Sequence, residues 1–297
     1  YGSVKPDLRN PLFIIDLSEF FNKCTFKPFI NRTVRAIKVS GHMSKGFHEK
    51  MLDYAMSIGM GGLGYLEVQE DLSFKGPIDK FIPEELKKEL LKIANLKQDD
   101  TIFFIADNEK RATELAGQIR TELAKRLDLI DNSKFEFCWI IDFPMFEMDE
   151  HDQIQFSHNP FSMPQGGLEA LENQNPLDIL AYQYDLVCNG IELSSGAVRN
   201  HDINIMLKAF EMAGYTEEEV RTKFGALYTA FQFGAPPHAG IAPGVDRMLM
   251  LLTGSESIRE VIAFPLSSKA EDLMMGAPGN VTKDQLRDVH IKLDIKK

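Results

Sequence analysis

Apolar and polar residues follow two different periods along the first half of the chain. Alternation at every second position predicts strands, whereas apolar positions three and four apart predict amphipathic helices. The largely alternating run 34–40 and residues 62–70 predict strands, and residues 101–107 predict a compact buried strand. The predicted helices are 17–21, 44–58, 83–94 and 109–127. Ser44 is the expected N-cap of its helix. Residues 30–128 should therefore form a self-contained α+β unit, in which no catalytic residue types cluster.

From residue 134 onward the pattern changes. A strongly apolar run at 135–144 predicts a strand buried on both faces. The other predicted elements are a Gly/Pro/Asn-rich connection at 158–176, strands at 181–193 and 197–199, and helices at 202–213, 216–232 and 248–253. Thr216 and the glutamates after it suit the start of a helix. With this change, a length of 297 residues indicates two domains.

Residues 236–247, just before the last of these helices, combine glycine, proline, aspartate and arginine. Gly240 and Gly244 would let the backbone approach a flat or bulky ligand, because no Cβ stands in the way. Asp246 can cap N–H groups at the helix start, and Arg247 offers a planar cation to a phosphate or an aromatic ring. Together they indicate a nucleotide site. The alternative is that this Gly-Pro cluster is only a turn.

Asp185, Glu192 and Arg199 are spaced seven residues apart. Residues seven apart in an unbroken strand point to opposite faces, but a bulge at 194–196 would re-aim Arg199. Two converging carboxylates beside a triphosphate suit Mg²⁺, and Arg199 could bind a substrate carboxylate through two hydrogen bonds. The alternative is that Glu192 and Arg199 form a solvated cross-strand ion pair.

Two histidines, His158 and His238, lie in loop-like sequence, and each fits either a turn or a site. No Ser-His-Asp arrangement, zinc-ligand spacing or Walker lysine motif stands out. The sequence therefore weighs against covalent and zinc hydrolases.

Composition narrows the class of protein further. The chain is 44% hydrophobic and 26% charged, as an ordinary globular protein is, and has no apolar run long enough to cross a bilayer. Cys24, Cys138 and Cys188 are scattered without metal-ligand spacing, which indicates a reducing cytoplasm. The net charge of −11 weighs against broad nucleic-acid binding, although it leaves room for a local basic face.

Several of these motifs, in order along the chain, resemble those of bacterial-type aspartyl-tRNA synthetases. They are 137–147, 158–161, 189–192, 198–199, 236–240 and 244–247, and residues 1–9 resemble the segment that follows the family's second signature motif. The resemblance implies an α+β fold, with part of a class II antiparallel sheet flanked by helices. It also implies an inserted α+β GAD domain at 30–128, which splits the catalytic domain into 1–29 and 129–297.

The resemblance implies that the parent enzyme activates L-aspartate with ATP and Mg²⁺ and then esterifies tRNA-Asp. The implied residues are Gly244, Val245, Asp246 and Arg247 for ATP, Glu192 for ATP and Mg²⁺, Asp185 for a second metal contact, and Arg199 and His158 for aspartate. This chemistry fits the residues, because the amino acid's own carboxylate attacks the α-phosphate and the enzyme supplies positioning and charge.

The sequence departs from the family in details and in extent. Asn159 follows His158 where many relatives have paired histidines, and residues 194–197 replace a glycine-rich run. The anticodon-binding barrel and motifs 1 and 2 precede Tyr1 in the family, so we expect a fragment of a cytoplasmic, homodimeric enzyme that does not bind membranes. Charging of tRNA-Asn as well depends on that missing part.

Two other functions remain alternatives. The fragment could be a non-catalytic binding module derived from a synthetase, with its GAD-like domain as a docking surface. An unrelated ATP-dependent ligase is the third interpretation.

The chain by itself is expected not to aminoacylate tRNA, because the α-phosphate arginine of the second motif would lie outside it. The check is to incubate the purified 297-residue chain with aspartate, ATP, Mg²⁺ and tRNA. Formation of Asp-tRNA would refute this prediction.

Overall fold

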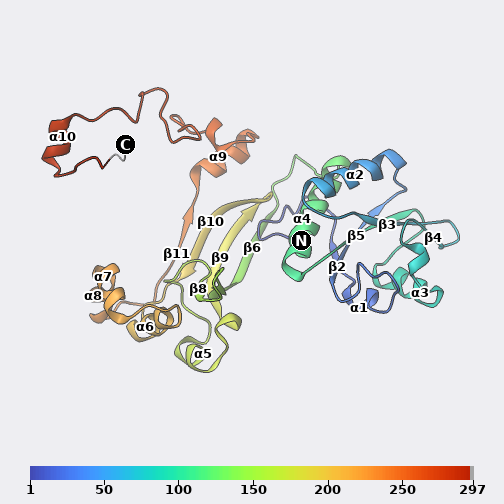
Figure 1. Cartoon of the computed structure of the whole chain (residues 1–297), viewed down its shortest axis with the longest axis horizontal. Helices are drawn as coiled ribbons and strands as arrows, with labels where there is room; N and C mark the ends of the chain where they lie inside the picture. The colour runs from blue at the N-terminus through green and yellow to red at the C-terminus, as the bar shows by residue number, and fades with distance from the viewer. Residues whose placement is uncertain (295–297) are drawn as a thin grey trace. The chain divides into compact units, whose positions relative to one another are not determined.

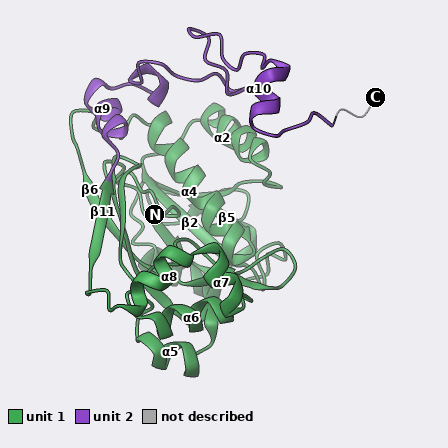
Figure 2. Ribbon diagram, turned by 90° about the vertical axis from the view of Figure 1, so that its left-hand side faces the viewer, with its two compact units in different colours: residues 1–242 green, residues 243–297 purple. Residues whose placement is uncertain are grey.

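The computed structural model describes residues 1–294, and Figure 1 shows the course of the chain. The chain divides into two compact units, Tyr1–Ala242 and Pro243–Lys297, which Figure 2 colours green and purple. The larger unit combines a five-stranded, a four-stranded and a two-stranded sheet with helices. The predicted α+β class is therefore confirmed. None of the helices in residues 1–294 combines the length and apolar character that a membrane crossing requires.

The first half of the larger unit is built on the five-stranded sheet, in the order β1-β2-β5-β3-β4. Its strands are β1 (Ile14–Asp16), β2 (Thr33–Ser40), β3 (Gly64–Val68), β4 (Phe74–Lys75) and β5 (Asp100–Asp107), and its helices are α1 (Ser18–Phe21), α2 (Lys45–Ser57), α3 (Glu84–Ile93) and α4 (Glu109–Arg126). Every pairing in it is antiparallel. The predicted cap is present, because the Ser44 hydroxyl accepts a hydrogen bond from the Phe47 amide (3.2 Å).

Apolar clusters lie on both faces of this sheet, which explains the buried central strand β5. Ile102 and Phe104 pack in one cluster with residues of α1 and α3. Phe103 and Ile105, which point to the opposite face, pack in a second cluster with residues of α2 and α4. A strand covered on both sides needs apolar residues at successive positions, and residues 102–105 supply them.

Packing is continuous across residues 29 and 30, where the sequence predicts a domain boundary. β1 pairs with β2, with Ile14 opposite Ile37. Phe21 of α1 is fully buried, with its ring edge-on to Phe104 of β5 at 5.2 Å. The sheet therefore begins at residue 14. The division into 1–29, 30–128 and 129–297 stays a prediction about domain organisation.

The second half of the larger unit is built on the four-stranded sheet, in the order β11-β10-β9-β6. Its strands are β6 (Phe137–Pro144), β9 (Leu180–Cys188), β10 (Ile191–Val198) and β11 (Ala239–Pro243), and β7 (Phe146–Met148) pairs with β8 (Ile154–Phe156). The helices are α5 (Gly167–Asn173), α6 (Ile203–Met212), α7 (Glu217–Lys223) and α8 (Gly225–Gln232). Two apolar clusters, one with Ala181 and Ala209 and one with Phe210 and Tyr228, hold these helices in place.

The prediction that residues 135–144 are buried on both faces is wrong. β6 is an edge strand of its sheet, and its side chains at 137–141 alternate between exposed and half-buried, whereas Phe143 is buried. Phe137, Trp139 and Ile141 are 56%, 56% and 61% exposed. An apolar run indicates that burial of a strand would be favourable. It does not show whether other elements of the same chain pack against that strand.

Three predicted elements differ in their bounds. The strand predicted at 181–193 is a hairpin of β9 and β10, and the connection at 158–176 contains the helix α5. The helix predicted at 216–232 is interrupted at Phe224, whose ring packs on Phe161 and Phe210 at 5.2 and 5.4 Å. Its capping box of Thr216 and Glu219 is present as expected.

The smaller unit contains helices α9 (Val245–Thr253) and α10 (Lys283–Asp288). Gly254, with a φ of 67°, ends α9 in the left-handed conformation that glycine adopts at little cost. Thr282 and Gln285 form a capping box at the start of α10.

Substitution of Phe21 by alanine is expected to destabilise the larger unit by about 3–5 kcal/mol, because the side chain is fully buried among aromatic rings. Phe233, which is 87% exposed, provides the matched control, and its alanine variant should stay within about 0.5 kcal/mol of the wild type. Urea unfolding followed by circular dichroism measures both. Equal losses in the two variants would contradict the assignment of the core.

Candidate functional site

A tight turn joins β9, which carries Asp185, to β10, which carries Glu192 and is followed directly by Arg199. Asn189 and Gly190 both have positive φ (52° and 82°), as the Asn-Gly hairpin turn requires. The Asn189 amide nitrogen donates to the Lys134 carbonyl (2.9 Å), and its amide oxygen accepts from the Glu136 N–H (2.9 Å). The turn is thereby fixed to the chain that leads into β6.

A β-bulge lies just beyond this turn. In the pairing of β10 with β9, Glu192 stands opposite Val187, and Ser195 stands opposite Asp185, with the register shifting between Glu192 and Ser194. Paired residues share a face of the sheet, and Asp185 and Val187 are two apart, so all four lie on one face. The two-residue turn thus places Glu192 on the face of Asp185, and one extra residue, Leu193, brings Ser195 to the same face. The bulge was predicted at 194–196 and lies slightly earlier.

The same alternation carries Arg199 to this face, because it follows Ser195 by four residues of extended chain. The Arg199 N–H donates to the His238 carbonyl (2.9 Å), and the residue forms a bridge with Ser162. Its guanidinium carbon lies 5.5 Å from the centre of the Phe161 ring, within cation–π range. Arg199 makes no ion pair with any residue in 1–294. The cross-strand pair with Glu192 that was the alternative interpretation is absent from this part of the chain.

The carboxylate of Asp185 is buried and incompletely hydrogen-bonded. The residue is 8% exposed, and its Oδ1 atom has no hydrogen-bond partner among residues 1–294. Burial of an ionised oxygen without a partner is costly, so such a group favours a cation or donor beside it. Mg²⁺ fits this environment because it takes carboxylate oxygens.

No group of three or more His, Cys, Asp or Glu side chains within residues 1–294 is arranged to hold a metal ion. A Mg²⁺ ion at Asp185 and Glu192 would therefore take its remaining oxygens from water and from substrate phosphates, as this ion commonly does.

Glu192 already has a cationic neighbour. Its half-buried carboxylate lies 2.9 Å from the Lys5 ammonium, which comes from the start of the chain. Sequence analysis missed Lys5, because no local pattern connects it to a residue so far along the chain. It also missed Gln183, which is 8% exposed and lies on the face of Asp185 two residues earlier in β9.

The absence of a side chain at Gly196 lets β10 and β11 lie close together. An added Cβ would lie 2.3 Å from the Gly240 carbonyl oxygen and 2.4 Å from the Tyr184 ring. β11 can therefore approach β10 only because residue 196 is glycine. An added Cβ at Gly240 would meet nothing within 4 Å in the same structure.

His158 lies in the loop after β8 and is exposed. Its Nδ1 lies 2.5 Å from the Ser157 carbonyl oxygen, and its ring is 5.0 Å from that of Phe143. Within residues 1–294 it makes no hydrogen bond or ion pair with Asp185, Glu192 or Arg199. Its part in an amino-acid pocket stays a prediction.

The remaining predicted residues belong to the smaller unit. Gly244 is the N-cap of α9 with a φ of −86°, and Val245, Asp246 and Arg247 form the first turn of that helix. The helix start thus presents N–H groups, an arrangement that suits an anion. Their roles in ATP binding stay predictions.

A profile of the family described as tRNA synthetases class II (D, K and N) matches residues 1–268. The chain belongs to this class II family. It is 53% identical to the aspartate–tRNA(Asp/Asn) ligase of Ehrlichia chaffeensis, covering all of this chain and 52% of that protein. It is 52% identical to the aspartate–tRNA ligase of Streptomyces coelicolor, covering 98% of this chain and 50% of that protein.

The chain therefore spans about half the length of the curated class II relatives it matches. Among solved structures, it is similar to an aspartyl-tRNA synthetase from Entamoeba histolytica, with 20% identity and a TM-score of 0.36, over 81% of this chain and 44% of that one.

Replacement of Asp185 by asparagine is expected to raise the unfolding temperature by about 2–4 °C, because a neutral amide avoids the burial of an unpartnered charge. Differential scanning calorimetry without nucleotide measures this shift. Asp53→Asn, on the exposed surface of α2, is the control and should leave the temperature unchanged. A lower unfolding temperature for Asp185→Asn would show that the carboxylate is stabilising.

Proposed function

We propose that this chain supplies the aspartate- and ATP-binding part of an aspartate–tRNA ligase. The observation that carries the proposal is the register of β9 and β10, in which the tight turn places Glu192 on the face of Asp185 and the bulge at Leu193 brings Arg199 to the same face. Two carboxylates and an arginine on a common face suit a metal–phosphate group beside a carboxylate-bearing amino acid. The names of relatives at 52–53% identity support the same activity.

The reaction divides into two steps. A carboxylate oxygen of aspartate attacks the α-phosphorus of ATP, and the bond to the departing pyrophosphate breaks, which gives aspartyl-adenylate. A ribose hydroxyl of tRNA then attacks the activated carbonyl carbon, and AMP leaves. Neither step needs a nucleophile from the protein, so its task is positioning and charge stabilisation.

The candidate residues have separate roles in these two steps. Arg199 binds the side-chain carboxylate of aspartate, and asparagine is disfavoured because its neutral amide would leave the half-buried cation poorly paired. Glu192 and Asp185 would hold Mg²⁺, which would neutralise phosphate charge when bound. Arg247 lies against the adenine or reaches the terminal phosphate, and Gly244 to Asp246 form the backbone beneath it.

The proposal extends to the partners of the complete enzyme. We infer L-aspartate, ATP and tRNA-Asp as substrates, a homodimer as the assembly, and the cytoplasm as the location. The Ehrlichia relative is named for both tRNA-Asp and tRNA-Asn, and the Streptomyces relative only for aspartate. Charging of tRNA-Asn is therefore a further part of the proposal.

A hollow in the α+β half supports the second candidate, a binding module. It has a volume of about 880 Å³ and is lined mainly by apolar side chains, among them Phe29, Met56 and Leu63. Side chains added at Gly61 or Gly62 would meet nothing within 4 Å, so the rim is open. A hollow of this size is large enough for a small ligand or a peptide side chain.

Thermal unfolding with ATP and Mg²⁺ tests the proposed function. Nucleotide at a hundred times its dissociation constant should stabilise the wild-type chain by about 2.7 kcal/mol. Glu192→Gln should lose most of this shift, because it removes the charge that holds the metal–phosphate group. Glu89→Gln, which alters an exposed ion pair with Lys23, is the control and should retain it.

The absence of any shift in the wild-type chain would favour the binding module. A full shift in Glu192→Gln would mean that ATP binds elsewhere.

A further inference from the structure

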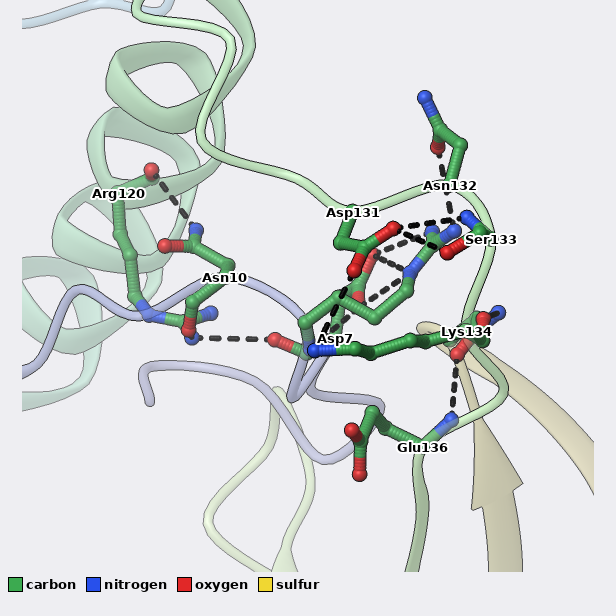
Figure 3. Close-up of polar contacts among 10 residues, drawn as sticks. Asp7, Asn10, Arg120, Asp131, Asn132, Ser133, Lys134 and Glu136 are labelled. Carbon is green, nitrogen blue, oxygen red and sulfur yellow. Dashed lines mark hydrogen bonds and ion pairs between the residues drawn. The ribbon is translucent and has the colours of Figure 1, made fainter.

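The first twelve residues, here called the N-terminal strap, are held against helix α4 by one buried arginine. Arg120 is 2% exposed, and its Nε donates to the Leu12 carbonyl (2.6 Å). A terminal nitrogen of the same guanidinium donates to the carbonyls of Asp7 (3.1 Å) and Asn10 (2.8 Å). The Asn10 amide donates back to the Arg120 carbonyl (3.1 Å), as Figure 3 shows. Arg120 thus fixes the strap at three points.

Backbone contact strengthens this attachment. A Cβ at Gly117 of α4 would lie 2.2 Å from the Gly2 carbonyl oxygen, so the strap can touch the helix only because residue 117 is glycine. The ring of Tyr1 lies over the Arg120 guanidinium at 5.0 Å. The geometry of the strap is therefore set by α4.

The other side of the strap touches the turn between β9 and β10. A Cβ at Gly190 would lie 3.7 Å from the Lys5 carbonyl oxygen and 3.6 Å from the Asp7 Cβ, which is ordinary contact distance. Asp7 is itself held by Arg9, whose guanidinium also donates to Asn132 (3.2 Å). With the backbone placed in this way, the Lys5 ammonium reaches Glu192 at 2.9 Å.

We propose that Lys5 is a phosphate-binding residue of the ATP site, and that Arg120 is the residue that positions it. The inference rests on the proposed function, in which Glu192 binds Mg²⁺ and ATP. A metal ion at Glu192 competes with the ammonium for the same carboxylate, and the triphosphate brings new negative charge next to it. Lysine has a flexible four-carbon stem and, with its side chain 46% exposed, can turn from the carboxylate to the phosphate.

An ordinary surface ion pair would behave differently. Lys23 and Glu89 form such a pair at 2.8 Å, with side chains 53% and 36% exposed. Exposed pairs of this kind contribute little to stability and have no influence on a distant ligand. Lys23→Met therefore serves as the matched control for Lys5→Met. It removes the same charge from a similar ion pair and makes the same small change in side-chain length.

The test is calorimetric titration of ATP with Mg²⁺ into the 297-residue chain and its variants. Lys5→Met should weaken binding about tenfold, because it removes one charge-assisted contact. Lys23→Met should bind as the wild type does. Arg120→Lys keeps the charge but cannot reach three carbonyls at once, so it should weaken binding by a similar factor. In the double variant with Lys5→Met, Arg120→Lys should add no further loss, since both act through one contact.

Asn10→Ala provides a second, milder variant for the positioning role, in case Arg120→Lys disturbs folding. It removes the hydrogen bond to the Arg120 carbonyl and should weaken ATP binding only when Lys5 is present. A loss that adds to that of Lys5→Met would overturn the positioning role of Arg120.

Glu192→Gln separates this inference from the function on which it rests. Weak binding by Glu192→Gln together with unchanged or tighter binding by Lys5→Met would overturn the role of Lys5 and leave the proposed function intact. Absence of ATP binding in the wild-type chain, or full binding by Glu192→Gln, would overturn both.

Discussion

One extra residue in β10 decides which side chains of the four-stranded sheet share a face. Without Leu193, Arg199 would stand on the face opposite to that of Asp185 and Glu192. The bulge is bounded by a turn that Asn189 fixes to the start of β6, and by Gly196, which lets β11 lie close to β10. The chemistry available to this half of the molecule depends on that local irregularity.

Much of the α+β half can be predicted from the sequence, because its helices and strands are packed and capped as their patterns of apolar and polar residues indicate. Residues 102–105 are apolar at successive positions, and apolar clusters lie on both faces of β5. Ser44 precedes an amphipathic run and caps it. Local propensity and packing agree at these positions, and such agreement makes a segment predictable.

Predictions that differ from the structure have two causes. Either tertiary packing decided the local structure, or a local sequence signal was given too little weight. The Asn189-Gly190 pair is a strong hairpin signal, yet the apolar residues on either side favoured a single strand. Phe224 interrupts a helical segment, and its ring packs against those of Phe161 and Phe210. Asp185, Glu192 and Arg199 stand out in the sequence as candidate site residues, whereas Lys5 does not. Its partner is distant in sequence and is reached only through the strap and Arg120.

The exposed side of β6 gives the molecule an optical reporter. Trp139 is the single tryptophan of the chain, is 56% exposed, and lies edge-on to Tyr184 with ring centres 6.0 Å apart. Indole emission depends on the polarity around the ring and on contact with water. Tryptophan fluorescence therefore reports, without a label, on any molecule that binds over β6. It is insensitive to ligands that bind far from this strand.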